Sequence, residues 1–182
     1  DVDVATMSAD LHGGFRRNAR GTVVEIRFEG GALAMRFLLP PDGVPLATLE
    51  AELTERDLSG RIGGSPLTLR LPRFRVETTT DLLPALRTLG LRDAVTGGRA
   101  DFSPTDGTRD LYLGVVKQRA AVLVNEEGAE ATALTEAAEL TLGAGDPPPR
   151  IEVRFDRPFL FAIVDLSHEA VLFVGRVEHP EE

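Results

Sequence analysis

Two apolar stretches separated by a glycine pair give the first clear pattern in the chain. Val23–Phe28 and Leu33–Leu39 carry apolar side chains at alternating or successive positions, and Glu29-Gly-Gly lies between them. Strands with a period of two, joined by a short glycine turn, are typical of a β-hairpin. The sequence therefore predicts a hairpin over 23–39.

After the predicted hairpin, apolar residues recur at helical spacing. Pro45 stands where a first helical turn tolerates proline, ahead of Leu46, Leu49 and Leu53. Thr54-Glu-Arg-Asp57 resembles a capping box, in which an acidic residue follows a threonine by three positions. Two short helices are therefore predicted, one after Pro45 and one after Thr54.

In the middle of the chain, apolar and polar residues alternate again, and a helical pattern follows. Leu67–Val76 predicts two strands with a bend at Pro72, because proline cannot donate to a sheet and marks an edge or a change of sheet. Asp81 is placed to cap a helix that Gly90 ends. The apolar positions of this helix are Leu82, Leu83, Leu86 and Leu89.

The remaining apolar runs predict strands. Leu111–Val124 is long, β-branched and apolar, as expected for a central strand buried on both faces. Ile151–Phe155 predicts a further strand, and Pro158–Val164 with Val171–Val177 predicts a hairpin turned at residues 165–169. The fold class is α+β, with no second domain boundary.

Composition narrows the classes of function. The 182 residues are 42% hydrophobic, enough for one globular domain, and the net charge of -9 disfavours a nucleic-acid partner. Without cysteine there is no disulfide or thiolate chemistry. No apolar run approaches the roughly 20 residues that span a bilayer, so no membrane partner is expected. Lys117 is the only lysine, and the arginine-, alanine- and glycine-rich usage indicates a GC-rich, bacterial genome, with selection for arginine pairing as the alternative.

The residues that could catalyse a reaction are few. His168 and His179 fall in a turn and beside the C-terminal Pro180, so both are predicted to be solvated surface side chains; His12 is the third histidine. Neither His168 nor His179 has neighbours at metal-ligand spacing. The pairs Gly13-Gly14, Gly30-Gly31 and Gly97-Gly98 are interpreted as turns without a phosphate-loop context. Neither an enzyme nor a cofactor is expected.

The segment from Asn125 to Pro149 is unusually long for a connection without a clear strand. Small residues recur with a period of two, at Ala129, Ala131, Ala133, Thr135 and Ala137. A strand built from this segment would present one small face and one larger, polar face, with Gly128 as a pivot. A surface helix over Glu126–Leu140 and a disordered linker are the alternatives that the local sequence leaves open.

Asn125-Glu-Glu-Gly-Ala-Glu-Ala131 resembles the hinge of the serpins, a family of serine protease inhibitors. Phe155-Asp-Arg-Pro-Phe-Leu-Phe161 resembles the segment that follows their reactive loop, and residues 172–180 resemble their C-terminal strand. Leu71-Pro-Arg-Phe74, Leu89-Gly-Leu91 and Ala100-Asp-Phe-Ser103 fall in the family's order. Residues 1–182 therefore resemble the C-terminal portion of a single serpin domain with mixed and antiparallel sheets and a reactive loop at about 126–149.

The resemblance implies a suicide-substrate inhibitor, whose loop is cleaved by a serine protease and then inserts into the main sheet. It places the reactive bond between Leu142 and Gly143, with Glu139, Leu140 and Thr141 as alternatives, which implies a chymotrypsin- or elastase-like target. The resemblance also implies an extracellular or cell-surface protein, with a cytoplasmic location as the alternative. The implied hinge residues are Glu126, Glu127, Gly128, Ala129, Glu130, Ala131, Thr132 and Ala133.

Three departures from the family pattern matter. Gln118-Arg119-Ala120 stands where many serpins have His-Lys-Ala, and Thr132 and Leu134 replace alanines. The N-terminal half of the family's fold is missing, so this half is an expected partner, and the chain alone is expected not to inhibit. The rival functions are a non-inhibitory serpin-like binding module and an inactive truncated serpin.

Overall fold

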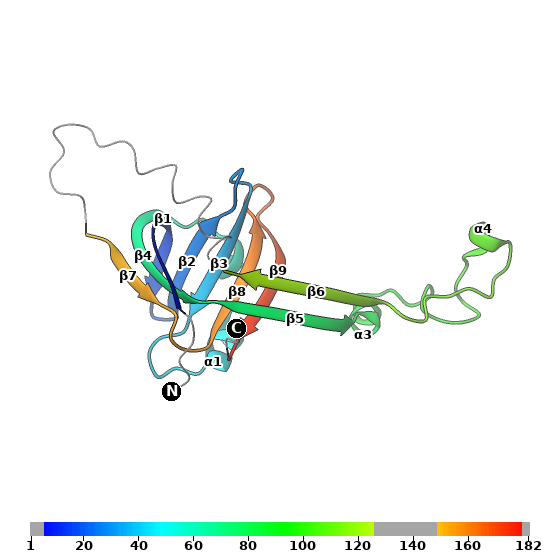
Figure 1. Cartoon of the computed structure of the whole chain (residues 1–182). Coiled ribbons are helices and arrows are strands. Elements are labelled where there is room, and N and C mark those ends of the chain that lie inside the picture. Colours follow the sequence, from blue (N-terminus) through cyan, green and yellow to red (C-terminus); the bar gives the residue numbers. More distant parts are fainter. Residues whose placement is uncertain (1–5, 126–148, 180–182) are drawn as a thin grey trace. The chain divides into compact units, whose positions relative to one another are not determined.

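A computed structural model describes residues 6–125 and 149–179 and divides the chain into two compact units (Figure 1). One comprises Asp1–Val76 and Leu123–Glu182, and the other comprises Glu77–Val122. The first contains a seven-stranded sheet, and a two-stranded sheet consists of β5 (Phe74–Asp81) and β6 (Lys117–Val124), most of whose residues belong to the second. Mixed and antiparallel sheets with few short helices confirm the α+β class.

The seven-stranded sheet has the order β7-β4-β1-β2-β3-β8-β9. Neighbouring strands are antiparallel except β4 and β7, which are parallel. Its strands are β1 (Thr6–Asn18), β2 (Gly21–Arg27), β3 (Leu33–Leu39), β4 (Gly64–Pro72), β7 (Ile151–Arg154), β8 (Phe159–Asp165) and β9 (Ala170–Val177).

The predicted hairpin at 23–39 is confirmed as β2 and β3. Gly30 and Gly31 form its turn with φ angles of 83° and 70°, a conformation that glycine adopts without steric cost. The C-terminal hairpin is likewise confirmed as β8 and β9. Both hairpins form where apolar stretches flank the predicted turns, although β3 and β8 are buried on both faces.

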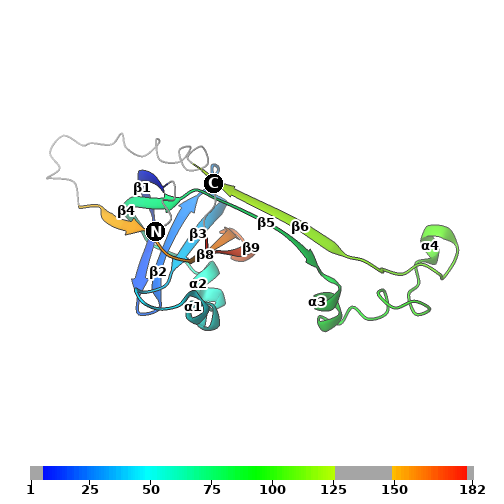
Figure 2. The same ribbon diagram turned by 60° about the horizontal axis from the view of Figure 1, so that its bottom comes forward.

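Short helices cover one face of the strands β2, β3 and β8 (Figure 2). They are α1 (Leu46–Glu52) and α2 (Glu55–Ser59), which begin where Pro45 and Thr54 predicted. Leu49 of α1 packs against Val23, Leu38 and Leu160 of the sheet. Burial of these side chains is the main stabilisation that such short helices receive.

The opposite face of the same strands is aromatic. Its five rings, which we call the aromatic cluster, meet at centroid distances of 5.1 to 6.2 Å, mostly edge to face. The cluster consists of Phe37, Phe74, Phe155, Phe159 and Phe161. Strand β3 is therefore buried on both faces, which makes it the centre of the hydrophobic core.

Pro72 marks the predicted change of sheet. Strand β4 ends there, and β5 (Phe74–Asp81) belongs to the two-stranded sheet. The carboxylate of Asp81 then accepts a hydrogen bond of 3.0 Å from the backbone N–H of Leu83, at the start of α3 (Leu83–Thr88). This helix is shorter than predicted, and Leu89 is 83% exposed rather than packed.

The second unit also contains α4 (Ser103–Asp106) and most of β6 (Lys117–Val124). Within the part of the chain that the structure describes, no helix is long and apolar enough to cross a membrane.

Two predictions made from local pattern are wrong. Gly13-Gly14 is not a turn but part of β1, where a Cβ on either residue would meet Glu25 at 2.8 Å. Leu111–Val124 is not a buried central strand, because the strand begins at Lys117 and Leu123 is 68% exposed. Among the described residues, β6 pairs only with β5, so it is an edge strand and not a central one.

Candidate functional site

All ten predicted site residues lie outside the described residues. They are the hinge residues Glu126, Glu127, Gly128, Ala129, Glu130, Ala131, Thr132 and Ala133, and the reactive bond Leu142–Gly143. The structure describes the two strands that flank this segment, β6 before it and β7 after it. The candidate site is therefore built here from these two anchors.

The first anchor is β6, which is exposed at Lys117–Arg119 and alternates between half-buried and exposed residues from Ala120 on. Ala120, Val122 and Val124 are half-buried and alternate with the exposed Ala121 and Leu123.

Two interactions tie β6 and the residues before it to β5 and the start of α3. The Arg119 guanidinium donates to the carboxylate of Glu77, and the N–H of Leu82 donates 2.8 Å to the carbonyl of Val116. Gln118, at the departure from the family pattern, is exposed here. Because β6 pairs only with β5 in the described residues, its other edge is open to a further strand.

The second anchor is β7, which is held by its backbone. It pairs in parallel with β4 from Leu67↔Ile151 to Arg70↔Arg154, and the N–H of Phe155 continues the ladder by donating 2.8 Å to the carbonyl of Arg70. Val153 is 2% exposed. The chain that follows the predicted loop is therefore fixed in the sheet from its first residues.

Arg157 fixes the connection between β7 and β8. Its Nε and Nη2 donate to the carbonyl of Pro40 at 3.2 and 2.8 Å, and Nη2 also lies 2.8 Å from Asp42 Oδ1. Nη1 donates 3.0 Å to Asp156. One guanidinium thus joins the end of the second anchor to the segment after β3, far away in sequence.

The aromatic cluster includes the residue that follows the second anchor. Phe155 follows β7 and packs against Phe37 and Phe159 at 5.7 and 5.1 Å, while Phe74 opens β5 and packs against Phe159 and Phe161. Residues at the ends of two separate strands therefore share one packed cluster. The sequence signal for it was the aromatic spacing in Phe155-Asp-Arg-Pro-Phe-Leu-Phe161, but no role could be assigned to it from spacing alone.

A buried ion pair stabilises the helix-covered face of the sheet. Arg36 and Glu25 are direct cross-strand partners and are 1% and 3% exposed. Arg36 Nε and Nη2 donate to Glu25 Oε2 at 2.8 and 2.5 Å, and Nη1 donates to the carbonyl of Leu58 in α2. Two charges in an apolar hairpin were the only signal for this pair in the sequence.

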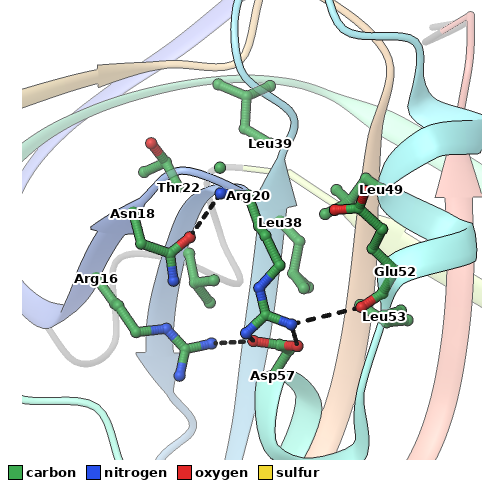
Figure 3. Close-up of a pocket in the computed structure, with 12 residues that line it drawn as sticks. Arg16, Asn18, Arg20, Thr22, Leu38, Leu39, Leu49, Glu52, Leu53 and Asp57 are labelled. Atoms are coloured by element: carbon green, nitrogen blue, oxygen red, sulfur yellow. Dashed lines mark hydrogen bonds and ion pairs between the residues drawn. The ribbon is translucent and has the colours of Figure 1, made fainter.

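Asp57 of α2 is a second charged centre (Figure 3). Arg16 and Arg20 point at it from β1 and the turn after it, with guanidinium nitrogens 3.1 and 2.9 Å from the carboxylate. Thr54 donates to Asp57 Oδ2 from its N–H, as the predicted capping box requires, and also from its hydroxyl. Burial acts to raise the pKa of Asp57, but the Thr54 hydrogen bonds and the two arginines outweigh it and hold the pKa below its ordinary value.

The gap beside Asp57 is too small to bind a ligand. Its volume is about 10 Å³, close to the minimum that one water needs. It is lined by leucines of β3 and α1 and by Arg16, Arg20 and Asp57 (Figure 3). We therefore interpret this arrangement as a clamp between β1 and α2.

The three histidines offer no catalytic arrangement within the described residues. His12, His168 and His179 are exposed, which confirms the surface prediction for His168 and His179. His168 Nδ1 lies 2.8 Å from Asp165 Oδ2 across the β8–β9 turn. Hydrogen bonds from the side chain and backbone of His168 lower the pKa of Asp165. In residues 6–125 and 149–179, no group of three or more possible ligands could hold a metal ion.

Comparison with known proteins agrees with the sequence resemblance. The family model "Serpin (serine protease inhibitor)" matches residues 1–180. Similar proteins are Iris of the tick Ixodes ricinus, 34% identical over 97% of this chain and 47% of that protein, and human Serpin B3, 36% identical over 98% of this chain and 46% of that protein. The bovine leukocyte elastase inhibitor is 35% identical over 92% of this chain and 46% of that protein.

A solved serpin from the trematode Schistosoma haematobium has a similar fold. It superposes with a TM-score of 0.78 at 20% identity and covers 98% of this chain and 47% of that one. This chain thus spans about half the length of the relatives it matches. Because the family model covers nearly every residue and the relatives exceed 30% identity, the chain belongs to the serpin family.

Proposed function

We propose that this chain is the loop-bearing half of a serine protease inhibitor that acts as a suicide substrate. Protease inhibition is supported at the level of the family, whose matched members include a leukocyte elastase inhibitor and antithrombin-III. Cleavage of the loop followed by its insertion into the main sheet is the finer proposal. The observation that carries it is a segment with alternating small residues, joined directly to a strand that is paired along only one edge within the described part of the chain.

Strand β6 supplies the place for insertion. A segment that turns back at Gly128 would run antiparallel to β6 and pair along its open edge. Ala129, Ala131 and Ala133 would then point to one face of the sheet, where side chains larger than alanine would overpack the layer beneath. The other end of the loop must stay in place while the first end inserts. Strand β7 meets this requirement, because its pairing with β4 and the contacts of Arg157 hold that end.

The proposed reactive bond is Leu142–Gly143. A leucine before the cleaved bond fits the apolar specificity pocket of a chymotrypsin- or elastase-like protease. No arginine or lysine lies between Glu126 and Pro149, which argues against a trypsin-like target. Glu139, Leu140 and Thr141 remain alternative positions for cleavage.

Activity requires the rest of the serpin fold. The chain spans about half of its relatives, so we propose that it acts together with an N-terminal half, in one polypeptide or as a separate chain. An extracellular or cell-surface location is the proposed setting, and the relatives named above do not decide it. Those relatives come from ticks and mammals, so a bacterial source rests only on codon-biased residue usage.

The decisive experiment incubates the whole protein with chymotrypsin and with elastase and seeks an SDS-stable complex on a gel. The complex is expected with the wild type. Substitution Ala131→Arg places a long charged side chain on the small face, so the loop should be cleaved without a stable complex. The matched control Glu130→Arg adds the same side chain on the opposite face and should keep the complex.

Two results would contradict the proposal. One is a stable complex formed by Ala131→Arg, because the small face would then have no role. The other is the absence of any complex with either protease while the loop is cleaved. Mass spectrometry of the cleaved chain would locate the bond, and cleavage outside 139–144 would refute the placement at Leu142.

A further inference from the structure

A second cavity opens where three connections of the sheet meet: the β1–β2 turn, the segment after β3 and the β7–β8 connection. Its volume is about 410 Å³, within the range of small-molecule sites and far larger than the gap beside Asp57. Three arginines, Arg17, Arg154 and Arg157, line it together with Asp42 and Asp156. Their charges decide what the cavity can bind.

Arg157 bridges the two carboxylates and offsets one of their two negative charges. Arg157 donates to the carbonyl of Pro40 and pairs with Asp42 at 2.8 Å and with Asp156 at 3.0 Å. Its donors are therefore directed at protein acceptors. Asp42 and Asp156 in turn have a cation already in place, which reduces their repulsion of an incoming anion.

Two contacts hold the Arg17 side chain in position. Its Nε donates 3.0 Å to Thr22 Oγ1, the hydroxyl of its cross-strand partner, and its guanidinium lies 5.3 Å from the centre of the Phe15 ring. These two contacts restrain the planar group. Within the described residues, no hydrogen-bond acceptor is found for its terminal nitrogens.

Arg154 presents a second guanidinium to the same cavity. Its nearest carboxylate is Asp156, at 3.9 Å from Nε, and its side chain is 62% exposed. The terminal nitrogens of Arg154 likewise have no acceptor among residues 6–125 and 149–179. The cavity therefore contains two guanidinium groups with donors to spare.

We propose that this cavity binds a phosphate or sulfate group through the terminal nitrogens of Arg17 and Arg154. A guanidinium donates two parallel N–H bonds to such a tetrahedral anion, and two of them can satisfy several of its oxygens. The cavity leaves room for a molecule attached to the anion. The site uses none of the predicted loop residues, so it is a function separate from loop cleavage.

Titration of the full chain tests the proposal directly. Arginine side chains labelled with ¹⁵N are followed by NMR while inorganic phosphate, inorganic sulfate or chloride is added at constant ionic strength. The Nε–Hε signals of Arg17 and Arg154 are expected to shift saturably with phosphate or sulfate. The oxyanion that binds more tightly identifies the group.

Variants separate a built site from general charge attraction. Arg17→Gln/Arg154→Gln is expected to weaken binding by about tenfold, because both donor pairs are lost. Arg61→Gln/Arg99→Gln removes two exposed arginines outside the cavity and should change it less than twofold. Arg154→Gln alone, at an exposed position, gives an intermediate loss in a chain whose packing is unchanged.

The proposal is overturned if chloride shifts the two signals as phosphate does. It is equally overturned if the double variant binds as tightly as the Arg61→Gln/Arg99→Gln control.

Discussion

Gly175 of β9 lies directly against the ring of Phe161 in β8. The two residues are cross-strand partners, and a Cβ placed on Gly175 would come within 2.5 Å of Phe161 Cζ. Phe161 is 2% exposed and belongs to the aromatic cluster, so the ring cannot move away without repacking the core. Glycine is therefore required here for space and not for its backbone angles.

Substitution Gly175→Ala should lower the free energy of unfolding by about 1–3 kcal/mol, the usual cost of overpacking a filled core. Urea denaturation followed by circular dichroism would measure the loss. Gly63→Ala is the control, because a Cβ there meets no atom within 4 Å. Equal stability of Gly175→Ala and the wild type would show that Phe161 has free space to occupy.

The buried pair Arg36–Glu25 should be strongly coupled. Arg36→Met leaves the buried Glu25 carboxylate without its hydrogen-bonded partner, with only the exposed Arg27 at 3.7 Å, and is expected to cost about 3–5 kcal/mol. The double variant Arg36→Met/Glu25→Leu should recover most of that loss, because no unpaired charge remains. A double-mutant cycle by chemical denaturation measures the coupling, and additive single losses would contradict it.

Arg27→Gln serves as the control for this cycle. Arg27 Nε lies 3.7 Å from Glu25 Oε1 and the side chain is 61% exposed. A solvent-exposed partner at that distance contributes little. Its replacement should leave the unfolding free energy nearly unchanged.

Asp57 should make stability depend on pH in the acid range. Its pKa in the folded protein lies below the ordinary value of 3.8, so its contribution is present above pH 3.8 and is lost as pH falls through the folded pKa. Asp57→Asn should destabilise the protein at pH 7 and remove part of the acid-range slope. Unfolding free energies measured at several pH values between roughly 2 and 7 test this expectation.

Glu52→Gln is the matched control for Asp57. Glu52 lines the same gap, but the hydrogen bond from Arg20 reaches its backbone carbonyl and not its carboxylate. The slope should therefore persist in Glu52→Gln. An unchanged slope in Asp57→Asn would show that protonation of Asp57 does not affect the free energy of unfolding.

Arg157 should control opening at the second anchor. Arg157→Gln removes the charged donors to Pro40 and Asp42, so amide exchange at residues 153–155 should accelerate by about tenfold, equivalent to about 1.4 kcal/mol. Hydrogen exchange with mass spectrometry resolves these residues. Exchange at β2 should not change, and acceleration there as well would indicate global rather than local opening.

Cleavage of the loop should stabilise the whole protein if the proposed mechanism is correct. A loop that is metastable outside the sheet gains free energy when it becomes a strand within it, so the nicked protein should melt at a higher temperature. Differential scanning calorimetry before and after limited proteolysis measures the shift. An identical melting temperature would mean that no energy is stored in the intact loop.

The sequence by itself determined the elements that depend on near neighbours. Both hairpins, the bend at Pro72 and the helix starts at Pro45 and Thr54 follow from periodicity, turns and caps, which act over a few residues. β1 could have been found in the same way, because Met7 and Leu11 are buried on one face. Its glycines, interpreted as turns, hid that alternation.

Only the tertiary structure decided which distant residues meet. Gly13 and Gly14 are required by the approach of Glu25, Arg157 reaches Pro40 at the end of the neighbouring strand, and Arg36 reaches the end of α2. The exposure of Leu123 was also decided this way, since an apolar run is buried only where a partner covers it. Local pattern sets the shape of an element, whereas burial and charge pairing depend on what the fold brings beside it.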